Sequence, residues 1–159
     1  MKKSSIVFLQ AVTVLIGLAA LLILARFPMT EGRAQGLDLL SIYLDPLILY
    51  GYASSIAFFT ALYKAFRFLG YMRENKLFSP SSVNALRSIK HCAIIFAIAV
   101  LVAGIYISIF HDPKDDAAGF ISMSILLTFI SVAASIAFAV AEKALQKAVD
   151  IKNENDLTI

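Results

Sequence analysis

The sequence predicts an all-α membrane protein, a bundle of four transmembrane helices with a connector helix between the second and third spans. Hydrophobic residues make up 60% of its 159 residues and charged residues only 16%, and the mean hydropathy is +0.81. A soluble domain is about 45–50% apolar and about 25% charged. A folded chain of this size leaves much of its surface exposed, so the excess apolar residues need lipid as their solvent.

Four apolar runs are each long enough to cross a hydrocarbon core about 30 Å thick. We expect a single domain with spans at about 6–25, 47–68, 92–110 and 120–140, followed by a tail at 141–159. The first run exceeds the roughly 7–15 apolar residues of a signal peptide, so we expect a retained span that ends near Arg26 and Pro28. Residues 37–44 are expected to form a helical turn on the membrane surface. Asp45 followed by Pro46 is typical of a helix start.

The basic residues are divided unequally between the two sides of these spans. Eleven of the 14 Lys and Arg residues lie in the chain start, the connector and the tail, and three lie in the other two loops. The positive-inside rule therefore predicts a multi-pass protein of the cytoplasmic membrane, with both termini and the connector in the cytoplasm.

The connector, residues 64–91, contains a helix-start signal. Ser79 is in the position of an N-cap, Pro80 is at the first helical position, and Phe78 is spaced to contact Val83 as a hydrophobic staple. We therefore expect an amphipathic helix that begins here and continues into the third span.

This connector helix is predicted to have Val83 and Leu86 on its apolar side and Arg87 and Lys90 elsewhere. Two interpretations remain open. The basic residues anchor the helix in anionic headgroups, or the surface recognises a partner.

The spans carry small and weakly polar residues at three- and four-residue spacing, which is typical of helix packing in membranes. One such polar set consists of Gln10, Thr128, Ser131 and Ser135. It is interpreted as a packing face, with a polar cavity as the alternative. No ionisable residue lies in the middle of a span, which argues against coupled transport and proton pumping. Glu142 falls on the same helical face as Ser124 and Ser135 but lies at the cytoplasmic end of the span, so it is expected to be a solvated end residue and not a proton relay.

The sequence gives no indication of an enzyme, a metal site or a cofactor. The GxSxG, HExxH and Walker A patterns are absent. The single cysteine, Cys92, excludes an internal disulfide and a cysteine-based zinc site. His91 and His111 lie at opposite ends of one expected helix, about 30 Å apart, so they cannot share a metal. No basic face is interleaved with stacking aromatics, so direct nucleic-acid binding is not expected.

The C-terminus combines acidic residues with a final apolar stretch. Asp156 is followed by Leu157, Thr158 and Ile159, which suit an extended strand that adds to a sheet edge or lies in a groove. The acidic residues are expected to pair with the protein's own connector bases or, alternatively, with a basic partner.

The connector and the C-terminus together resemble the bacterial four-span family catalogued as domain of unknown function 2975. Its members typically show Phe-x-x-x-x-Val-x-x-Leu-Arg-x-Ile after the second span and end in an acidic stretch followed by Leu-Thr-Ile. The matching residues are Phe78, Val83, Leu86, Arg87, Ile89, Asp156, Leu157, Thr158 and Ile159. The resemblance implies an integral cytoplasmic-membrane protein with no assigned activity. Genes of the family often neighbour one for a Cro/C1-type helix-turn-helix regulator, which suggests that regulator as a partner.

The predicted function is a non-enzymatic regulatory or sensory module that acts through its cytoplasmic connector and tail. The alternative is a subunit of a passive small-solute transporter or channel. Membrane lipid is an expected partner under either prediction, and a homo-oligomer is compatible with both.

Overall fold

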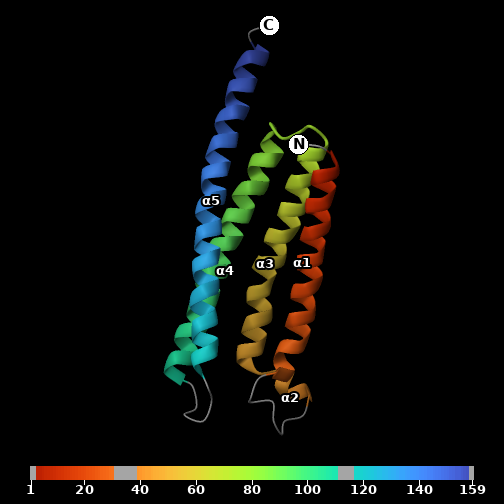
Figure 1. The fold of residues 1–159 in the computed structure, drawn as a ribbon. Coiled ribbons are helices and arrows are strands. Elements are labelled where there is room, and N and C mark those ends of the chain that lie inside the picture. Colours follow the sequence, from red (N-terminus) through yellow and green to blue (C-terminus); the bar gives the residue numbers. More distant parts are fainter. Residues whose placement is uncertain (1–2, 31–38, 111–116, 158–159) are drawn as a thin grey trace.

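The computed structural model describes residues 3–30, 39–110 and 117–157, and its elements are all α-helices. The chain runs through α1 (Lys3–Thr30), α2 (Leu39–Tyr43), α3 (Pro46–Arg73), α4 (Pro80–Phe110) and α5 (Ala117–Leu157) (Figure 1). In this described part of the chain, α1, α3, α4 and α5 are the four helices long and apolar enough to cross a membrane. The prediction of an all-α protein with four transmembrane helices is therefore confirmed.

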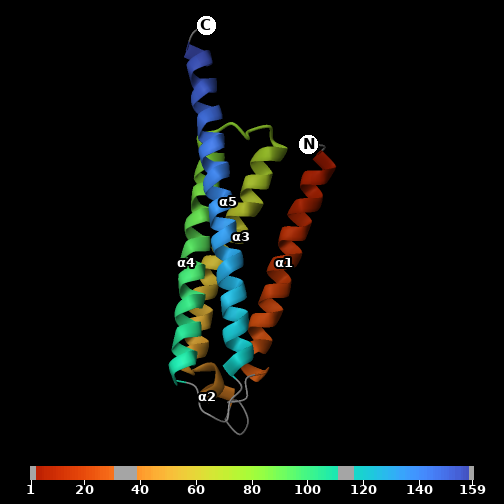
Figure 2. The same ribbon diagram turned by 60° about the vertical axis from the view of Figure 1, so that its left-hand side comes forward.

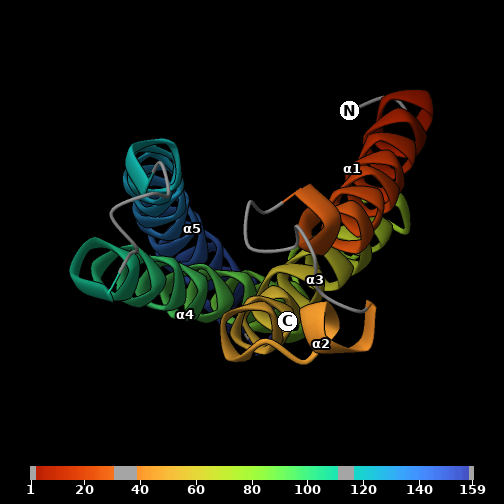
Figure 3. The ribbon, with the colours of Figure 1, turned by 90° about the horizontal axis from the view of Figure 1, so that it is seen from below.

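The long helices pack in the order in which the chain makes them: α1 on α3, α3 on α4, and α4 on α5. Viewed along the bundle, they form a curved row with α1 and α5 at its two ends (Figure 3). The N-terminus, the C-terminus and the link between α3 and α4 lie at one end of the molecule, and α2 lies at the other (Figures 1 and 2). We call the first of these the connector end and the second the loop end.

Helix α1 extends farther than expected: it does not end near Arg26 but continues through Pro28 to Thr30. Proline has no N–H, so it leaves the carbonyl four residues earlier, that of Leu24, without its helical donor. The Tyr52 hydroxyl of α3 donates to this carbonyl at 3.3 Å, and the Tyr43 hydroxyl of α2 donates to the next one, that of Ala25, at 3.3 Å. The Tyr52 hydroxyl thus supplies a donor to the carbonyl that Pro28 leaves without one, and Tyr43 adds a second contact from α2.

The loop end shows the predicted start of α3. Asp45 is its N-cap and accepts a 2.8 Å hydrogen bond from the Leu47 amide through Oδ1, and Pro46 is the first helical residue. The helical turn expected within residues 37–44 is α2, five residues long.

At the connector end, α3 closes with hydrogen bonds from the Asn75 amide to the Met72 carbonyl and from the Lys76 amide to the Tyr71 carbonyl. These are the two bonds of a Schellman motif, and Asn75 takes the left-handed conformation, φ 59°, that the motif needs. The Lys76 ammonium lies 3.0 Å from the Glu74 carboxylate and holds the pKa of that carboxyl below its usual range.

Helix α4 begins where the sequence indicated and runs directly into the third span. Ser79 caps the helix: its carbonyl accepts from the Ser82 amide at 3.1 Å, and its hydroxyl accepts from the same amide at 3.4 Å. From Pro80 the helix continues without a break to Phe110, so residues 80–91 are the first three turns of the third long helix.

Two glycines allow neighbouring helices to approach closely. A Cβ added at Gly17 of α1 would lie 3.1 Å from Leu62 Cδ2 of α3. A Cβ added at Gly104 of α4 would lie 3.1 Å from Ser124 Cβ of α5 and would also collide with the Ser124 hydroxyl. Small residues at these positions therefore let the backbones come together, as expected for helices packed in lipid.

Candidate functional site

The contact between α4 and α5 is one continuous seam with a regular three- and four-residue spacing. The α5 side is formed by Ser124, Thr128, Ser131, Ser135, Phe138, Glu142, Leu145 and Val149. The α4 side is formed by Val83, Leu86, Lys90, Ala93, Ala97, Val100, Gly104 and Ile107. Every one of these residues is buried or half-buried. A spacing that averages 3.5 residues keeps one face of each helix toward its partner, as in a left-handed coiled coil.

At the connector end this seam closes in a hydrophobic cluster. Val83 and Leu86 of α4 pack with Leu145 and Val149 of α5, and all four are buried. Phe68, Leu77 and Phe138 pack against this cluster from its edges. Because Val83 and Leu86 are covered by α5, they do not belong to an exposed interaction surface. Their role is to hold the two helices together.

The predicted staple uses a different residue from the one expected. Phe78 is 50% exposed, whereas the preceding residue, Leu77, packs against the hydrophobic cluster that contains Val83. Of the apolar candidates in the connector, Phe78 is therefore the one that the fold leaves accessible.

Beside the cluster, Arg87 and Lys90 of α4 converge on one carboxylate of α5. Arg87 Nε donates to Glu142 Oε1 at 2.7 Å, and Lys90 Nζ donates to Glu142 Oε2 at 2.6 Å. The Glu142 side chain is only 10% exposed, so the prediction of a solvated end residue was wrong. Two charge-assisted hydrogen bonds offset the cost of removing this carboxylate from water.

This ion-pair cluster replaces the predicted pairing between the connector bases and the acidic tail. Helix α5 continues without a break to Leu157, so Asp156 lies about 21 Å beyond Glu142 along the same helix. The prediction of an extended strand was wrong at Leu157, which is helical. Thr158 and Ile159 lie outside the described residues. The last turns of α5 project beyond the connector (Figure 1).

The four residues of the predicted polar face lie in two different seams. Gln10 of α1 is buried and donates to the Phe66 carbonyl of α3 at 3.4 Å. Thr128 donates to the Ser124 carbonyl of its own helix at 2.7 Å, and Ser131 and Ser135 belong to the α5 stripe that faces α4. These residues therefore pack helices and do not line one common cavity.

Sequence reasoning missed the role of Glu142 and of the α5 residues that follow it. The signal was present, because the three- and four-residue spacing that begins at Ser124 runs on through Glu142 and Leu145 to Val149. Extending the stripe past the end of the apolar run would have placed Glu142 in the packed seam.

Within residues 3–30, 39–110 and 117–157, no three His, Cys, Asp or Glu side chains gather in a position to hold an ion. Cys92 is a half-buried residue of α4.

These features define a multi-pass helical membrane protein whose third and fourth spans are clamped together at the connector end. The chain belongs to the family described as "Protein of unknown function (DUF2975)", whose model matches residues 29–159. It is similar to the uncharacterized membrane protein YoaS of Bacillus subtilis (strain 168), with 37% identity over 161 residues that cover 100% of both chains. No solved structure matches it.

Proposed function

We propose that this protein is a non-enzymatic regulatory or sensory module of the cytoplasmic membrane that binds a soluble partner at its connector end. The observation that carries the proposal is the length of α5. Its last residue packed in the seam is Val149, yet the helix continues to Leu157 and projects beyond the other helices (Figure 1). Eight further helical residues extend about 12 Å beyond the seam.

The composition of this projecting segment, residues 150–157, supports a binding role. Ile151 is 60% exposed, and Lys152 and Glu154 are exposed beside it. An exposed apolar side chain flanked by charges suits an amphipathic helix that docks in a partner's groove. Phe78, on the connector at the same end of the molecule, offers a second exposed apolar contact.

The distribution of charge supports a cytoplasmic position for this end. The chain start, the connector and the tail carry 11 of the 14 Lys and Arg residues. Basic residues near membrane spans are retained on the cytoplasmic side. A soluble cytoplasmic protein would therefore be able to reach both Ile151 and Phe78.

The seam between α4 and α5 gives a physical route by which the membrane segment would affect the tail. From Ser124 to Val149 the two helices share one packed interface, and the projecting segment is its direct helical continuation. A change in how α4 and α5 cross would therefore move residues 150–157. The partner class that we favour is a helix-turn-helix regulator, which the family resemblance suggests.

The transporter alternative gains no support from the described contacts. It needs hydroxyl groups that face a path for solute, whereas Thr128 bonds to its own helix and Ser135 is buried in the seam. We therefore propose only the regulatory role.

Site-specific photocrosslinking in living cells tests this function. A benzoylphenylalanine at Ile151 should form a discrete adduct with a soluble protein, and one at Phe78 should capture the same protein. The matched control is Ile136, on the same helix and 61% exposed, but within the apolar part expected to face lipid. Capture of a soluble protein at Ile136 as well, or none at Ile151, would contradict the proposal.

A further inference from the structure

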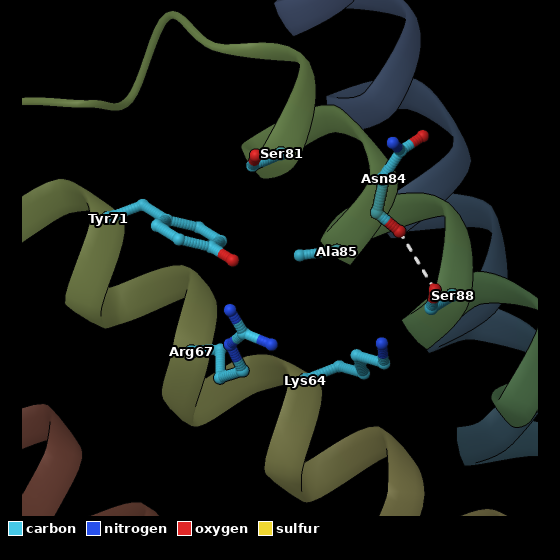
Figure 4. Close-up of a pocket in the computed structure, with 7 residues that line it drawn as sticks. All are labelled: Lys64, Arg67, Tyr71, Ser81, Asn84, Ala85 and Ser88. Carbon is cyan, nitrogen blue, oxygen red and sulfur yellow. Dashed lines mark hydrogen bonds between the residues drawn. The ribbon is translucent and has the colours of Figure 1, made fainter.

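A pocket of about 180 Å³ lies between α3 and α4 at the connector end (Figure 4). From α3 it is lined by Lys64, Arg67 and Tyr71, and from α4 by polar residues that include Ser81 and Ser88. It is separate from the α4–α5 seam, and the proposed docking role does not use it. None of the described residues that line it is acidic.

No acidic side chain among the described residues in the lining of this pocket balances its positive charge. Lys64 and Arg67 lie three residues apart on α3, so two like charges face the same space. Elsewhere at this end, the fold neutralises Arg87 and Lys90 with the buried Glu142 carboxylate. The pocket has two cations and no such carboxylate in its lining, so an anion entering it would relieve their repulsion.

The side chains are arranged as donors around one space. In Figure 4 the Arg67 guanidinium, the Lys64 ammonium and the Tyr71 hydroxyl point toward the region below Ala85. The Arg67 guanidinium lies 5.6 Å from the centre of the Tyr71 ring, a cation–π contact that helps to fix its position. A positioned guanidinium fork, a lysine and a hydroxyl match the oxygens of a phosphate group.

The position of the pocket along α3 and α4 indicates where that phosphate comes from. Lys64 lies 18 residues after Pro46, the first residue of α3, which is about 27 Å along the helix. Ser88 lies 22 residues before Phe110, the last residue of α4, which is about 33 Å. The hydrocarbon core is about 30 Å thick, so the pocket is at the level of the lipid headgroups.

Apolar side chains continue from the pocket toward the membrane interior. Ile56 lies 11 residues before Arg67, and Ile95 lies seven residues after Ser88, so each is on nearly the same helix face as its counterpart. Both are exposed. They lie about 17 Å and about 11 Å along their helices toward the membrane interior, within reach of the acyl chains of a lipid whose phosphate occupies the pocket.

We propose that this pocket binds the phosphate of an anionic phospholipid, with Lys64 and Arg67 as the charged ligands and the Tyr71 hydroxyl as an additional donor. Basic pockets between transmembrane helices on the cytoplasmic side are a known physical form of headgroup recognition. The bound lipid would fill the space between α3 and α4 at the connector end. At this same end, Arg87 and Lys90 of α4 pair with Glu142 of α5.

Lipid titration of the purified full-length protein in a neutral detergent, with bound lipid counted by native mass spectrometry, tests the site. Phosphatidylglycerol should be retained more strongly than zwitterionic phosphatidylcholine. Lys64→Gln or Arg67→Gln should each weaken phosphatidylglycerol binding about fivefold, and the double variant about thirtyfold. Tyr71→Phe keeps the ring under Arg67 and should cause a smaller loss.

The matched control is the double variant Lys143→Gln/Lys147→Gln, which removes two exposed positive charges from α5 at the same end of the molecule. It should leave phosphatidylglycerol binding unchanged, and an equal loss there would overturn the site in favour of diffuse attraction. Helical circular dichroism and size-exclusion profiles verify that all variants are folded. Displacement of the lipid by an equal concentration of glycerol 1-phosphate, which has the phosphate without the chains, would overturn the lipid assignment.

Discussion

Lys90 Nζ of α4 donates a 2.6 Å hydrogen bond to Glu142 Oε2 of α5, and this bond joins residues 52 positions apart in the chain. Arg87 occupies the other carboxylate oxygen at 2.7 Å. The cluster lies beside the hydrophobic contacts that close the seam, so apolar packing and charge pairing hold the same pair of helices at the same end. We call this combination of the ion-pair cluster and the hydrophobic cluster the clamp.

The substitution Glu142→Gln should weaken the clamp, because it leaves Arg87 and Lys90 without their charged acceptor. We expect the free energy of unfolding to fall by about 1.5–3 kcal/mol, measured by denaturant titration in mixed micelles. Lys90→Met should then cost less in the Glu142→Gln background than in the wild-type protein, since the partner is already gone. Equal costs in the two backgrounds would show that Lys90 and Glu142 do not interact.

The control for this cycle is Glu74→Gln, which removes a carboxylate at the same end of the molecule. Glu74 is exposed and pairs with Lys76, two residues away within the connector. Because this pair joins no two helices and is screened by water, we expect the stability of the variant to match that of the wild-type protein.

Gly104→Ala should separate α4 from α5 near the loop end of their seam. The added methyl collides with the Ser124 side chain, so we expect a loss of about 1–3 kcal/mol in the same unfolding measurement. Ser124→Ala introduced together with it should recover part of the loss by removing the hydroxyl.

Gly51→Ala is the matched control on α3, where an added Cβ meets nothing within 4 Å. It should be neutral or slightly stabilising, because alanine favours helix over glycine by about 1 kcal/mol. If both glycine variants are equally well tolerated, the close approach at Gly104 is not needed for packing.

A pair of adjacent substitutions tests which residue staples the connector to the bundle. Leu77→Ala removes a side chain packed against the hydrophobic cluster, so it should lower the unfolding free energy by about 2 kcal/mol. Phe78→Ala removes a larger side chain that is half exposed and should cost clearly less. The reverse order would restore Phe78 as the staple.

Single cysteines at the two ends of the molecule test the orientation. In a Cys92→Ala background, Ala117→Cys at the loop end should react with a membrane-impermeant thiol reagent in intact cells. Lys76→Cys, exposed in the connector, should react only after the cells are opened. This outcome follows from the unequal division of basic residues, and labelling at Lys76 in intact cells would reverse the proposed topology.

Much of the fold could be predicted from the sequence, because the relevant signals are local. The length and apolarity of each run determined that there are four spanning helices. Asp45 with Pro46, and Ser79 with Pro80, determined two helix starts, since a cap interacts with amides only two or three residues away. The spacing of small residues predicted helix packing along the spans, and Gly104 of α4 is one place where it occurs.

The tertiary structure alone decided which groups satisfy one another. Pro28 indicated a helix end, but α1 continues past it, and the Tyr52 hydroxyl of α3 donates to the Leu24 carbonyl that the proline leaves without a helical donor. The sequence predicted that Glu142 is a solvated end residue. The position of α4 beside α5 buries its carboxylate and supplies the cations of Arg87 and Lys90 as partners. Local patterns determine whether a segment is a helix and which face is apolar. The burial of a polar group and the identity of its partner depend on helices far away in sequence, and only their packing brings these groups together.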